Sequence, residues 1–110
     1  MAEVVCKLRG KELFRESIKK PVVAIGRDTD CEIQIDNLAI SREHCRIHFE
    51  GGKFILRDLG SANGTEINGT RVKEKTLADG DEIGIGKYIL IFLEHSGDSM
   101  DLAGKEEQGE

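Results

Sequence analysis

The sequence predicts an all-β domain, a sandwich or a barrel of about nine to eleven short strands. Three kinds of observation lead to this prediction. Apolar and polar residues alternate along much of the chain, which is the period of a strand with one buried face. Pairs of turn residues separate these runs at hairpin-like spacing. The chain has 13 glycines and one proline, and no segment keeps a helical spacing over several turns without a glycine.

Runs in the first half of the chain predict three strands. VVAIG at residues 22–26 is mostly apolar and resembles a buried strand. EIQID at 32–36 and CRIHFE at 45–50 alternate strictly, so each is expected to have one buried face. The residues expected on those buried faces are Ile33, Ile35, Cys45, Ile47 and Phe49.

Two-residue turns predict hairpins in the second half. Gly51-Gly52 separates CRIHFE from the alternating run KFILRDL, and Asn68-Gly69 separates TEI from TRV. Further turns at Asp79-Gly80 and Gly86-Lys87 precede DEIGI and the last strand. That last strand, YILIFLE, is apolar on both faces, so we expect it to be central in a sheet and covered on both sides.

The chain divides into a domain and a tail. Its 110 residues suit one compact domain that buries about 65% of its unfolded surface. We expect this domain at residues 1–96. Residues 97–110 are polar, acidic and without periodicity, which predicts a disordered tail or linker. The tail carries −4 of the net charge of −5, so the domain is nearly neutral.

Composition argues against several classes of function. A neutral domain lacks the basic excess that non-specific nucleic-acid binding needs. The longest apolar run is too short to span a bilayer, and the N-terminus does not resemble a signal peptide. Cys6, Cys31 and Cys45 fit neither a disulfide framework nor a zinc site, which favours buried thiols in a reducing compartment. We therefore expect a cytoplasmic protein without cofactor, metal, nucleic-acid or membrane partner.

Three polar clusters interrupt the strands: Gly26-Arg27, the segment from Ser41 to His44, and GSANGT at residues 60–65. Two antiparallel strands separate the second cluster from the third, so the chain returns to the same end of its sheet between them. The second and third clusters should therefore be neighbours. The same argument leaves the position of Arg27 open, because the stretch that follows it has too little pattern for strands to be counted.

Ser41 and His44 permit more than one interpretation. As nucleophile and base, oriented by Asp58 or Glu43, they would indicate a hydrolase. The chain has no nucleophile elbow, however, and a loop of a small sandwich supplies little cleft. As metal ligands, His44 and His48 lack a third ligand at a telling spacing.

An anion site needs a permanently charged planar group and short donors on preformed loops. Arg27 and Arg42 supply guanidinium groups, Ser41 supplies a hydroxyl, and the loop at Asn63 supplies an amide with adjacent backbone N–H groups. Each charge-assisted hydrogen bond contributes about 1.5–3 kcal/mol, so a few of them distinguish a phosphate from a bare hydroxyl. Taken singly, each residue also has a simpler explanation, such as an ion pair of Arg27 with Asp28.

The order of these clusters resembles that of the forkhead-associated (FHA) domain family. The matching elements are Gly26-Arg27, Ser41-x-x-His44, Asn63-Gly64 and Asn68-Gly69. The resemblance covers about residues 3–95 and implies a two-sheet antiparallel β-sandwich of about eleven short strands, with ligand loops at one end. It also implies that Arg27 lies at that end. The family binds phosphorylated motifs through clustered arginines.

The resemblance implies a role for each matched residue. Arg27 and Ser41 would hold the phosphate of a phosphothreonine, with Arg42 beside them. Asn63 would bind the peptide main chain, and Asn68 would shape the next turn and contact the peptide. The framework positions of these loops would be Gly26, His44 and Gly64.

One position departs from the family pattern. Thr or Ser often precedes the loop asparagine, whereas this chain has Ala62. A side-chain hydroxyl is lost, although the backbone N–H of Ala62 can still donate. Two outcomes stay open: a lower affinity, or compensation by Ser61.

The resemblance thus implies a module without catalysis that binds phosphothreonine-containing proteins or peptides, the products of an upstream Ser/Thr kinase. The alternative is a protein-interaction or scaffold domain that ignores phosphorylation, which Ala62 and the neutral domain favour.

Overall fold

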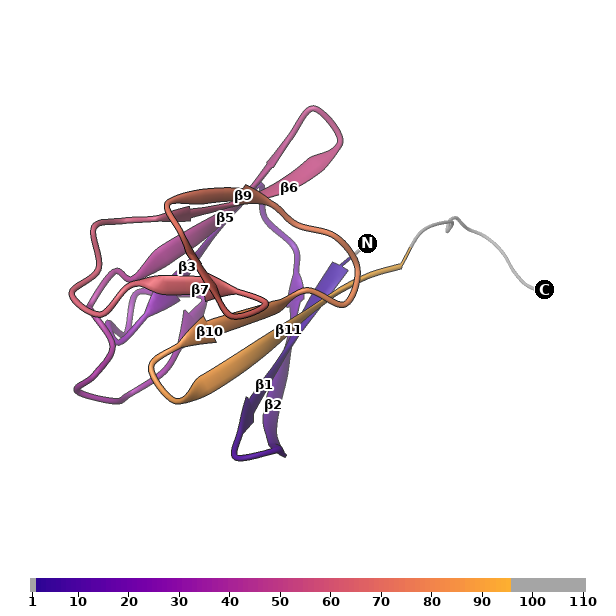
Figure 1. Cartoon of the computed structure of the whole chain (residues 1–110). Coiled ribbons are helices and arrows are strands. Elements are labelled where there is room, and N and C mark those ends of the chain that lie inside the picture. The colour runs from indigo at the N-terminus through magenta and orange to yellow at the C-terminus, as the bar shows by residue number, and fades with distance from the viewer. Residues whose placement is uncertain (1, 96–110) are drawn as a thin grey trace.

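The computed structural model describes residues 2–95, which form a β-sandwich of eleven strands and contain no helix (Figure 1). The strands are β1 (Ala2–Leu8), β2 (Lys11–Ile18), β3 (Val22–Gly26), β4 (Ile33–Gln34), β5 (Cys45–Glu50), β6 (Lys53–Asp58), β7 (Thr65–Ile67), β8 (Thr70–Val72), β9 (Glu74–Thr76), β10 (Glu82–Ile85) and β11 (Tyr88–Glu94). The expected boundary after residue 96 and the acidic tail at 97–110 lie outside the described residues. No helix within the described range could cross a membrane.

The strands form two facing sheets. The first has the order β2-β1-β11-β10-β7-β8, and the second has the order β4-β3-β5-β6-β9. Within residues 2–95 the pairs are antiparallel except β3 and β4, which run parallel with Ile25 opposite Ile33. The predicted two-sheet antiparallel sandwich of about eleven short strands is confirmed, with one parallel pair at an edge.

The core lies between the sheets because alternation turns one face of each strand inward. The buried side chains of the first sheet include Val4, Cys6, Leu90 and Phe92, and those of the second include Val23, Ile25, Ile47 and Leu56. Phe92 meets Phe54 of the opposite sheet with ring centroids 5.2 Å apart. Burial of this apolar surface, worth roughly 25 cal/mol per Å², is the main stabilising contribution.

The predicted buried faces are correct except at one residue. Ile33, Ile35, Cys45 and Ile47 are all buried. Phe49 is 47% exposed, although its ring contacts Phe54. It lies at the far end of β5, where the β5–β6 hairpin projects beyond the sandwich, and it therefore has too little opposite sheet to cover it (Figure 1).

The predicted hairpins have the backbone that such turns need. Gly51 and Gly52 have φ values of 57° and 77°, and Asn68 and Gly69 have values of 51° and 87°. Left-handed φ at both central residues lets the turn follow the twist of the flanking strands. Both dipeptides join neighbouring antiparallel strands, β5 to β6 and β7 to β8.

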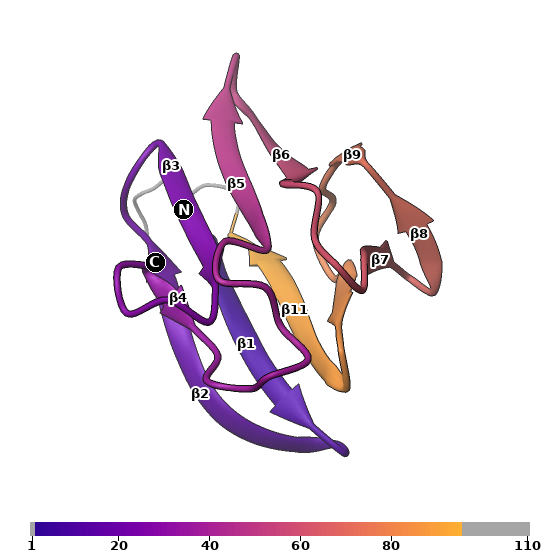
Figure 2. The same cartoon turned by 90° about the vertical axis from the view of Figure 1, so that its left-hand side faces the viewer.

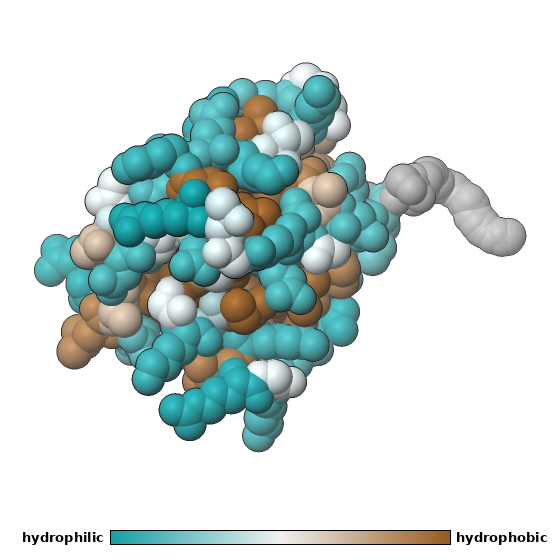
Figure 3. Space-filling model, in the orientation of Figure 1, coloured by the Kyte–Doolittle hydropathy of each residue, from teal (hydrophilic) through white to brown (hydrophobic). Residues whose placement is uncertain are grey.

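β11 is central, but the expectation that both its faces are covered was wrong. It lies between β1 and β10, and Leu90 and Phe92 on its inner face are fully buried. On its outer face Ile89 remains 37% exposed, because no second layer of described residues covers that side of the first sheet. Figure 3 shows hydrophobic residues at the surface over β10 and β11.

Candidate functional site

The β4–β5 and β6–β7 loops lie against each other, as the strand count predicts. Three hydrogen bonds join them: the Ala62 N–H donates to Ser41 Oγ (3.0 Å), the Asn63 side-chain amide donates to the Ala39 carbonyl (2.7 Å), and His44 Nε2 contacts the Gly64 carbonyl (2.7 Å). Figure 2 looks onto this end of the sandwich, where the β3–β4, β4–β5 and β6–β7 loops lie side by side.

Arg27 lies at the same end, which the sequence pattern left open. Its backbone N–H donates to the Ser41 carbonyl (3.0 Å), and the next N–H, of Asp28, donates to the Arg42 carbonyl (3.1 Å). The guanidinium is held as well, because Arg27 Nε donates to the Ile40 carbonyl (3.0 Å). The two terminal nitrogens of the guanidinium keep their N–H donors for a ligand.

His44 ties the two loops together from inside. It is fully buried, and its Nδ1 accepts the backbone N–H of Ser41 (3.2 Å). With Nδ1 as acceptor, Nε2 carries the proton and donates to the Gly64 carbonyl, so one neutral tautomer satisfies both contacts. The imidazole therefore binds the Ser41 main chain and not its hydroxyl, which is not the nucleophile–base contact of a serine hydrolase.

Asp58 organises the β6–β7 loop, a role that the sequence reasoning missed. Its carboxylate accepts hydrogen bonds from the Gly60 N–H (3.0 Å), the Ser61 N–H (3.1 Å) and hydroxyl (2.6 Å), and the Thr65 hydroxyl (2.7 Å). Burial pushes the pKa of Asp58 up, but the hydrogen bonds from Ser61 and Thr65 outweigh it and hold the pKa below its ordinary value. The signal was an Asp two residues before a Gly-Ser pair, which is typical of an Asx-type turn.

Two of the predicted framework positions require glycine for steric reasons. A Cβ on Gly26 would overlap the backbone carbonyl of Arg42. Gly64 has a φ of 85°, which strains any side chain with a Cβ; a Cβ there would also lie 2.5 Å from Nε of Arg71, whose flexible side chain would have to move. The Arg71 guanidinium therefore covers the Asn63-Gly64 turn, although Arg71 comes from β8.

Asn68 lies apart from the other matched residues. It follows β7, whereas the Asn63 loop precedes it, so the two asparagines are at opposite ends of that short strand. Its amide donates to Asp81 (3.0 Å), and its carbonyl oxygen accepts the Glu82 N–H (3.0 Å). Asn68 thus shapes the β7–β8 turn, as predicted, and joins it to β10; its predicted contact with the peptide stays a prediction.

The hydrogen bonds around Ala62 show which donors remain at the position where the family usually has Thr or Ser. The Ala62 N–H is already used by Ser41 Oγ. The Ser61 hydroxyl is buried, donates to Asp58 and accepts the Gly64 N–H (3.0 Å). Neither the Ala62 N–H nor the Ser61 hydroxyl keeps a hydrogen to donate to a ligand, which argues against compensation by Ser61; the effect on affinity stays a prediction.

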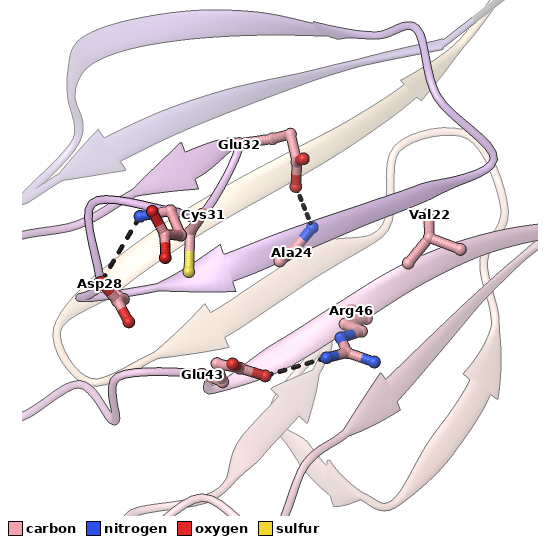
Figure 4. Close-up of a pocket in the computed structure, with 8 residues that line it drawn as sticks. Val22, Ala24, Asp28, Cys31, Glu32, Glu43 and Arg46 are labelled. Carbon is pink, nitrogen blue, oxygen red and sulfur yellow. Dashed lines mark hydrogen bonds and ion pairs between the residues drawn. The ribbon is translucent and has the colours of Figure 1, made fainter.

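The electrostatics differ on the two sides of the β3–β4 loop. A depression of about 300 Å³ is lined by Arg27, Arg42, Asp28 and Asp36, two charges of each sign. The hollow on the other side, shown in Figure 4, contains Asp28, Glu32 and Glu43, and an ion pair of 2.9 Å occupies Arg46 with Glu43. An anion would therefore approach from the side of Arg27 and Arg42.

Comparisons with known proteins agree with this arrangement. The family model of the FHA domain matches residues 23–86. The glycogen accumulation regulator GarA of Mycolicibacterium smegmatis is 42% identical over 76 residues, which are 69% of this chain and 48% of GarA. The chain spans about half the length of the curated relatives it matches.

Solved structures extend the match to the whole described domain. One of them concerns phosphothreonine-dependent FHA domain interactions; it is 32% identical with a TM-score of 0.77 and covers 86% of this chain and 98% of that chain. EmbR of Mycobacterium tuberculosis, solved with a low-affinity phosphopeptide, is 29% identical with a TM-score of 0.77 over 87% of this chain and 25% of EmbR. The family model and these structures together show that the chain belongs to the FHA domain family.

Proposed function

We propose that the chain is a phosphothreonine-peptide-binding module that recruits partners phosphorylated by a Ser/Thr kinase and catalyses no reaction. The observation that carries this proposal is the joining of three distant segments at one rim. Arg27 donates hydrogen bonds to the carbonyls of Ile40 and Ser41, and Asn63 donates to the carbonyl of Ala39. Ser41 also accepts the Ala62 N–H, so the segment 39–41 holds all three polar side chains at one rim. The relatives described as phosphothreonine-dependent or as bound to a phosphopeptide support the same ligand class.

The proposed phosphate site uses donors that are already held in place. Ser41 Oγ accepts the Ala62 N–H and so keeps its own proton to donate to a phosphate oxygen. Arg27 is fixed through Nε and offers its terminal nitrogens. Arg42 is exposed at the edge of the same depression and adds a second positive charge. Because these groups are preorganised, little conformational entropy is lost when the phosphate binds.

The peptide main chain is proposed to lie over Asn63. This side chain is exposed, and its bond to the Ala39 carbonyl uses one N–H and leaves the other N–H and the amide oxygen available. Gly26, His44 and Gly64 act behind it as framework residues, since they fix the backbones of the loops. The proposal names the class of partner, a phosphothreonine-containing protein, and the class of kinase, a Ser/Thr kinase; it does not name a particular protein or kinase.

The proposed location is the cytoplasm. Cys6, Cys31 and Cys45 are free and buried, as expected of structural thiols in a reducing compartment. Burial raises the pKa of Cys6 to about 11, so this thiol stays protonated and unreactive near neutral pH.

Binding of a phosphothreonine peptide array, with unphosphorylated copies beside it, tests the proposal. Arg27→Ala should weaken binding of the phosphorylated peptides about ten- to hundredfold, because one charge-assisted hydrogen bond is worth about 1.5–3 kcal/mol. Arg15→Ala is the matched control, since Arg15 is an exposed arginine on β2 that pairs with Glu12 (2.8 Å). Equal binding of phosphorylated and unphosphorylated peptides would favour the alternative, an interaction domain that ignores phosphorylation.

A further inference from the structure

Strand β2 is a long free edge of the sandwich. It ends the first sheet beside β1, and no other strand within residues 2–95 pairs with its outer side (Figure 1). The other edge strands in this part of the chain, β4, β8 and β9, have two or three residues, whereas β2 has eight. A long edge leaves backbone N–H and C=O groups open to a further strand, and natural proteins usually keep such edges short. Strand β2 is therefore a candidate for pairing with another chain.

The sequence of β2 is complementary to itself when it is read in the opposite direction. Its segment KELFRE at residues 11–16 carries charge in the order plus, minus, apolar, apolar, plus, minus. Two copies can pair antiparallel about a twofold axis between Leu13 and Phe14, so that every contact forms twice. The residues then opposite each other are Lys11 and Glu16, Glu12 and Arg15, and Leu13 and Phe14. Each cation of one copy thus meets a carboxylate of the other.

Charge also disfavours the neighbouring registers. A twofold axis through Phe14 would place Glu12 opposite Glu16. An axis through Leu13 would place Lys11 opposite Arg15. Like charges directly opposite each other destabilise a strand pair, whereas opposite charges stabilise it. The segment therefore selects one register for pairing with its own copy.

A β-bulge makes the faces of the strand agree with this register. Phe14 lies opposite Cys6 of β1, and Glu12 lies opposite the next residue, Lys7, so Leu13 is an extra residue in β2. Side chains of a regular strand alternate between faces, so residues an odd number of positions apart lie on opposite faces. The extra residue reverses this rule across the bulge. Residues an odd number of positions apart on its two sides, such as 12 and 15 or 11 and 16, share a face.

The contacts of β2 agree with this assignment of faces. Arg15 Nε donates to the Glu12 carboxylate (2.8 Å), which places both side chains on the outer face of the sheet. Lys11 and Glu16 lie opposite residues of the inner row of β1. Directly opposite residues of two paired strands share a face. The register that matches the charges is therefore also the one that matches the faces.

Three side chains of β2 have little to contact within residues 2–95. Leu13 is 48% exposed, and Lys11 and Glu16 are exposed and have no ion pair in this part of the chain. Pairing with a second copy would bring Leu13 against Phe14, which is half-buried at the margin of the core. Charges on an edge usually repel a second strand, but here they complement those of an identical strand.

We propose that two copies of this chain form an antiparallel homodimer through β2, which joins their first sheets into one continuous sheet. Leu13 and Phe14 lie at the twofold axis, and the pairs of Lys11 with Glu16 set the register. This inference goes beyond the proposed function and does not depend on it.

Sedimentation velocity of the full chain over about 1 µM to 1 mM tests the dimer. We expect a Kd of about 10–500 µM, because an interface of one strand pair is smaller than the standard size. The variants K11E and E16K should each raise the Kd at least about tenfold, since each reversal turns two symmetry-related attractions into repulsions.

Charge exchange tests the register itself. An equimolar mixture of K11E and E16K should form a heterodimer, because residue 11 of each variant then meets an opposite charge at residue 16 of the other. The double variant K11E/E16K should form a homodimer with a Kd within about threefold of the wild-type value. A role of these side chains in the fold alone would not make two separately impaired variants associate.

The control variant K53E reverses an exposed charge on β6, in the second sheet, and should dimerise as the wild type does. Circular dichroism and urea unfolding check that each variant keeps its fold. A wild type that stays monomeric at about 1 mM would overturn the proposal. Unchanged dimerisation in K11E and E16K, or a mixture of the two that forms no dimer, would overturn it as well.

Discussion

Hydrogen bonds inside the rim decide which residues remain available to a ligand. Ser41 Oγ is occupied as an acceptor and free as a donor, whereas the Ala62 N–H and the Ser61 hydroxyl are both committed. One exchanged hydrogen bond contributes about 0.5–1.5 kcal/mol net, so a single committed donor changes affinity measurably. At the scale of residues, the loop therefore has one side-chain hydroxyl fewer than the usual family pattern, and we expect the proposed phosphate site to have one donor fewer.

Ala62→Ser should restore that donor. The side chain of residue 62 is exposed next to Ser41, so a hydroxyl fits without repacking. We expect affinity for a phosphothreonine peptide to rise about three- to tenfold, and affinity for the unphosphorylated copy to stay the same. Titration by fluorescence anisotropy measures both. An unchanged affinity for the phosphopeptide would show that residue 62 does not face the phosphate.

At the scale of elements, each loop owes its shape to an anchoring side chain, half-buried Asp58 or buried His44, and not to its own sequence alone. Asp58 closes the β6–β7 loop with four accepted hydrogen bonds, and His44 then fastens this loop to the β4–β5 loop. A carboxylate in this position is acceptor-only, which matches the four donors that surround it. The loops are thus preorganised as a pair.

Asp58→Asn should destabilise the domain by about 1–3 kcal/mol at neutral pH, because an amide places N–H groups against donors. The folded pKa of Asp58 is lowered, so its stabilisation is present above the unfolded pKa of about 4 and is lost as the pH falls through the folded pKa. The difference between wild type and variant in the free energy of unfolding should therefore shrink below about pH 4.

Urea unfolding at several pH values measures this difference. Asp30→Asn, which changes an exposed carboxylate on the β3–β4 loop, is the matched control and should leave stability unchanged. A difference between wild type and Asp58→Asn that stays constant with pH would contradict the role of the carboxylate.

At the scale of the whole molecule, stability and recognition occupy different regions. The core lies between the sheets, where Phe54 and Phe92 connect them, and the proposed ligand groups lie on loops at one end. Loops of variable sequence on a rigid sandwich are a common way to place binding residues. Changes in the core should therefore alter unfolding and leave the affinity of the folded domain alone.

Phe92→Ala should lower the free energy of unfolding by about 3–5 kcal/mol, because a fully buried ring leaves a cavity. Phe49→Ala is the matched control: Phe49 also packs on Phe54, with ring centroids 4.7 Å apart, but is 47% exposed and should cost clearly less. Chemical denaturation compares the variants. Similar losses in both would mean that the sheets are not joined at Phe92.

Sequence reasoning predicted the positions of the strands better than it predicted which distant strands pair. The alternation of CRIHFE and the Gly51-Gly52 turn are local features, and they predicted β5, β6 and their pairing correctly. The strands β1 and β2 were not predicted individually, and the pairing of β1 with β11 joins segments from opposite ends of the described residues. The wrong expectation for the outer face of β11 has a similar origin. The hydrophobic residues of β11 are visible in the local sequence, but whether they are covered depends on which segments pack against that face.

By itself the sequence determined the strand periods, the turns and the order of the polar clusters, because these depend on side-chain alternation and on backbone sterics over a few residues. Only the tertiary structure decided that Arg27 shares an end with Ser41 and that the Ala62 N–H is already used. Those facts depend on contacts between segments far apart in the chain, and no local pattern encodes the distance between them.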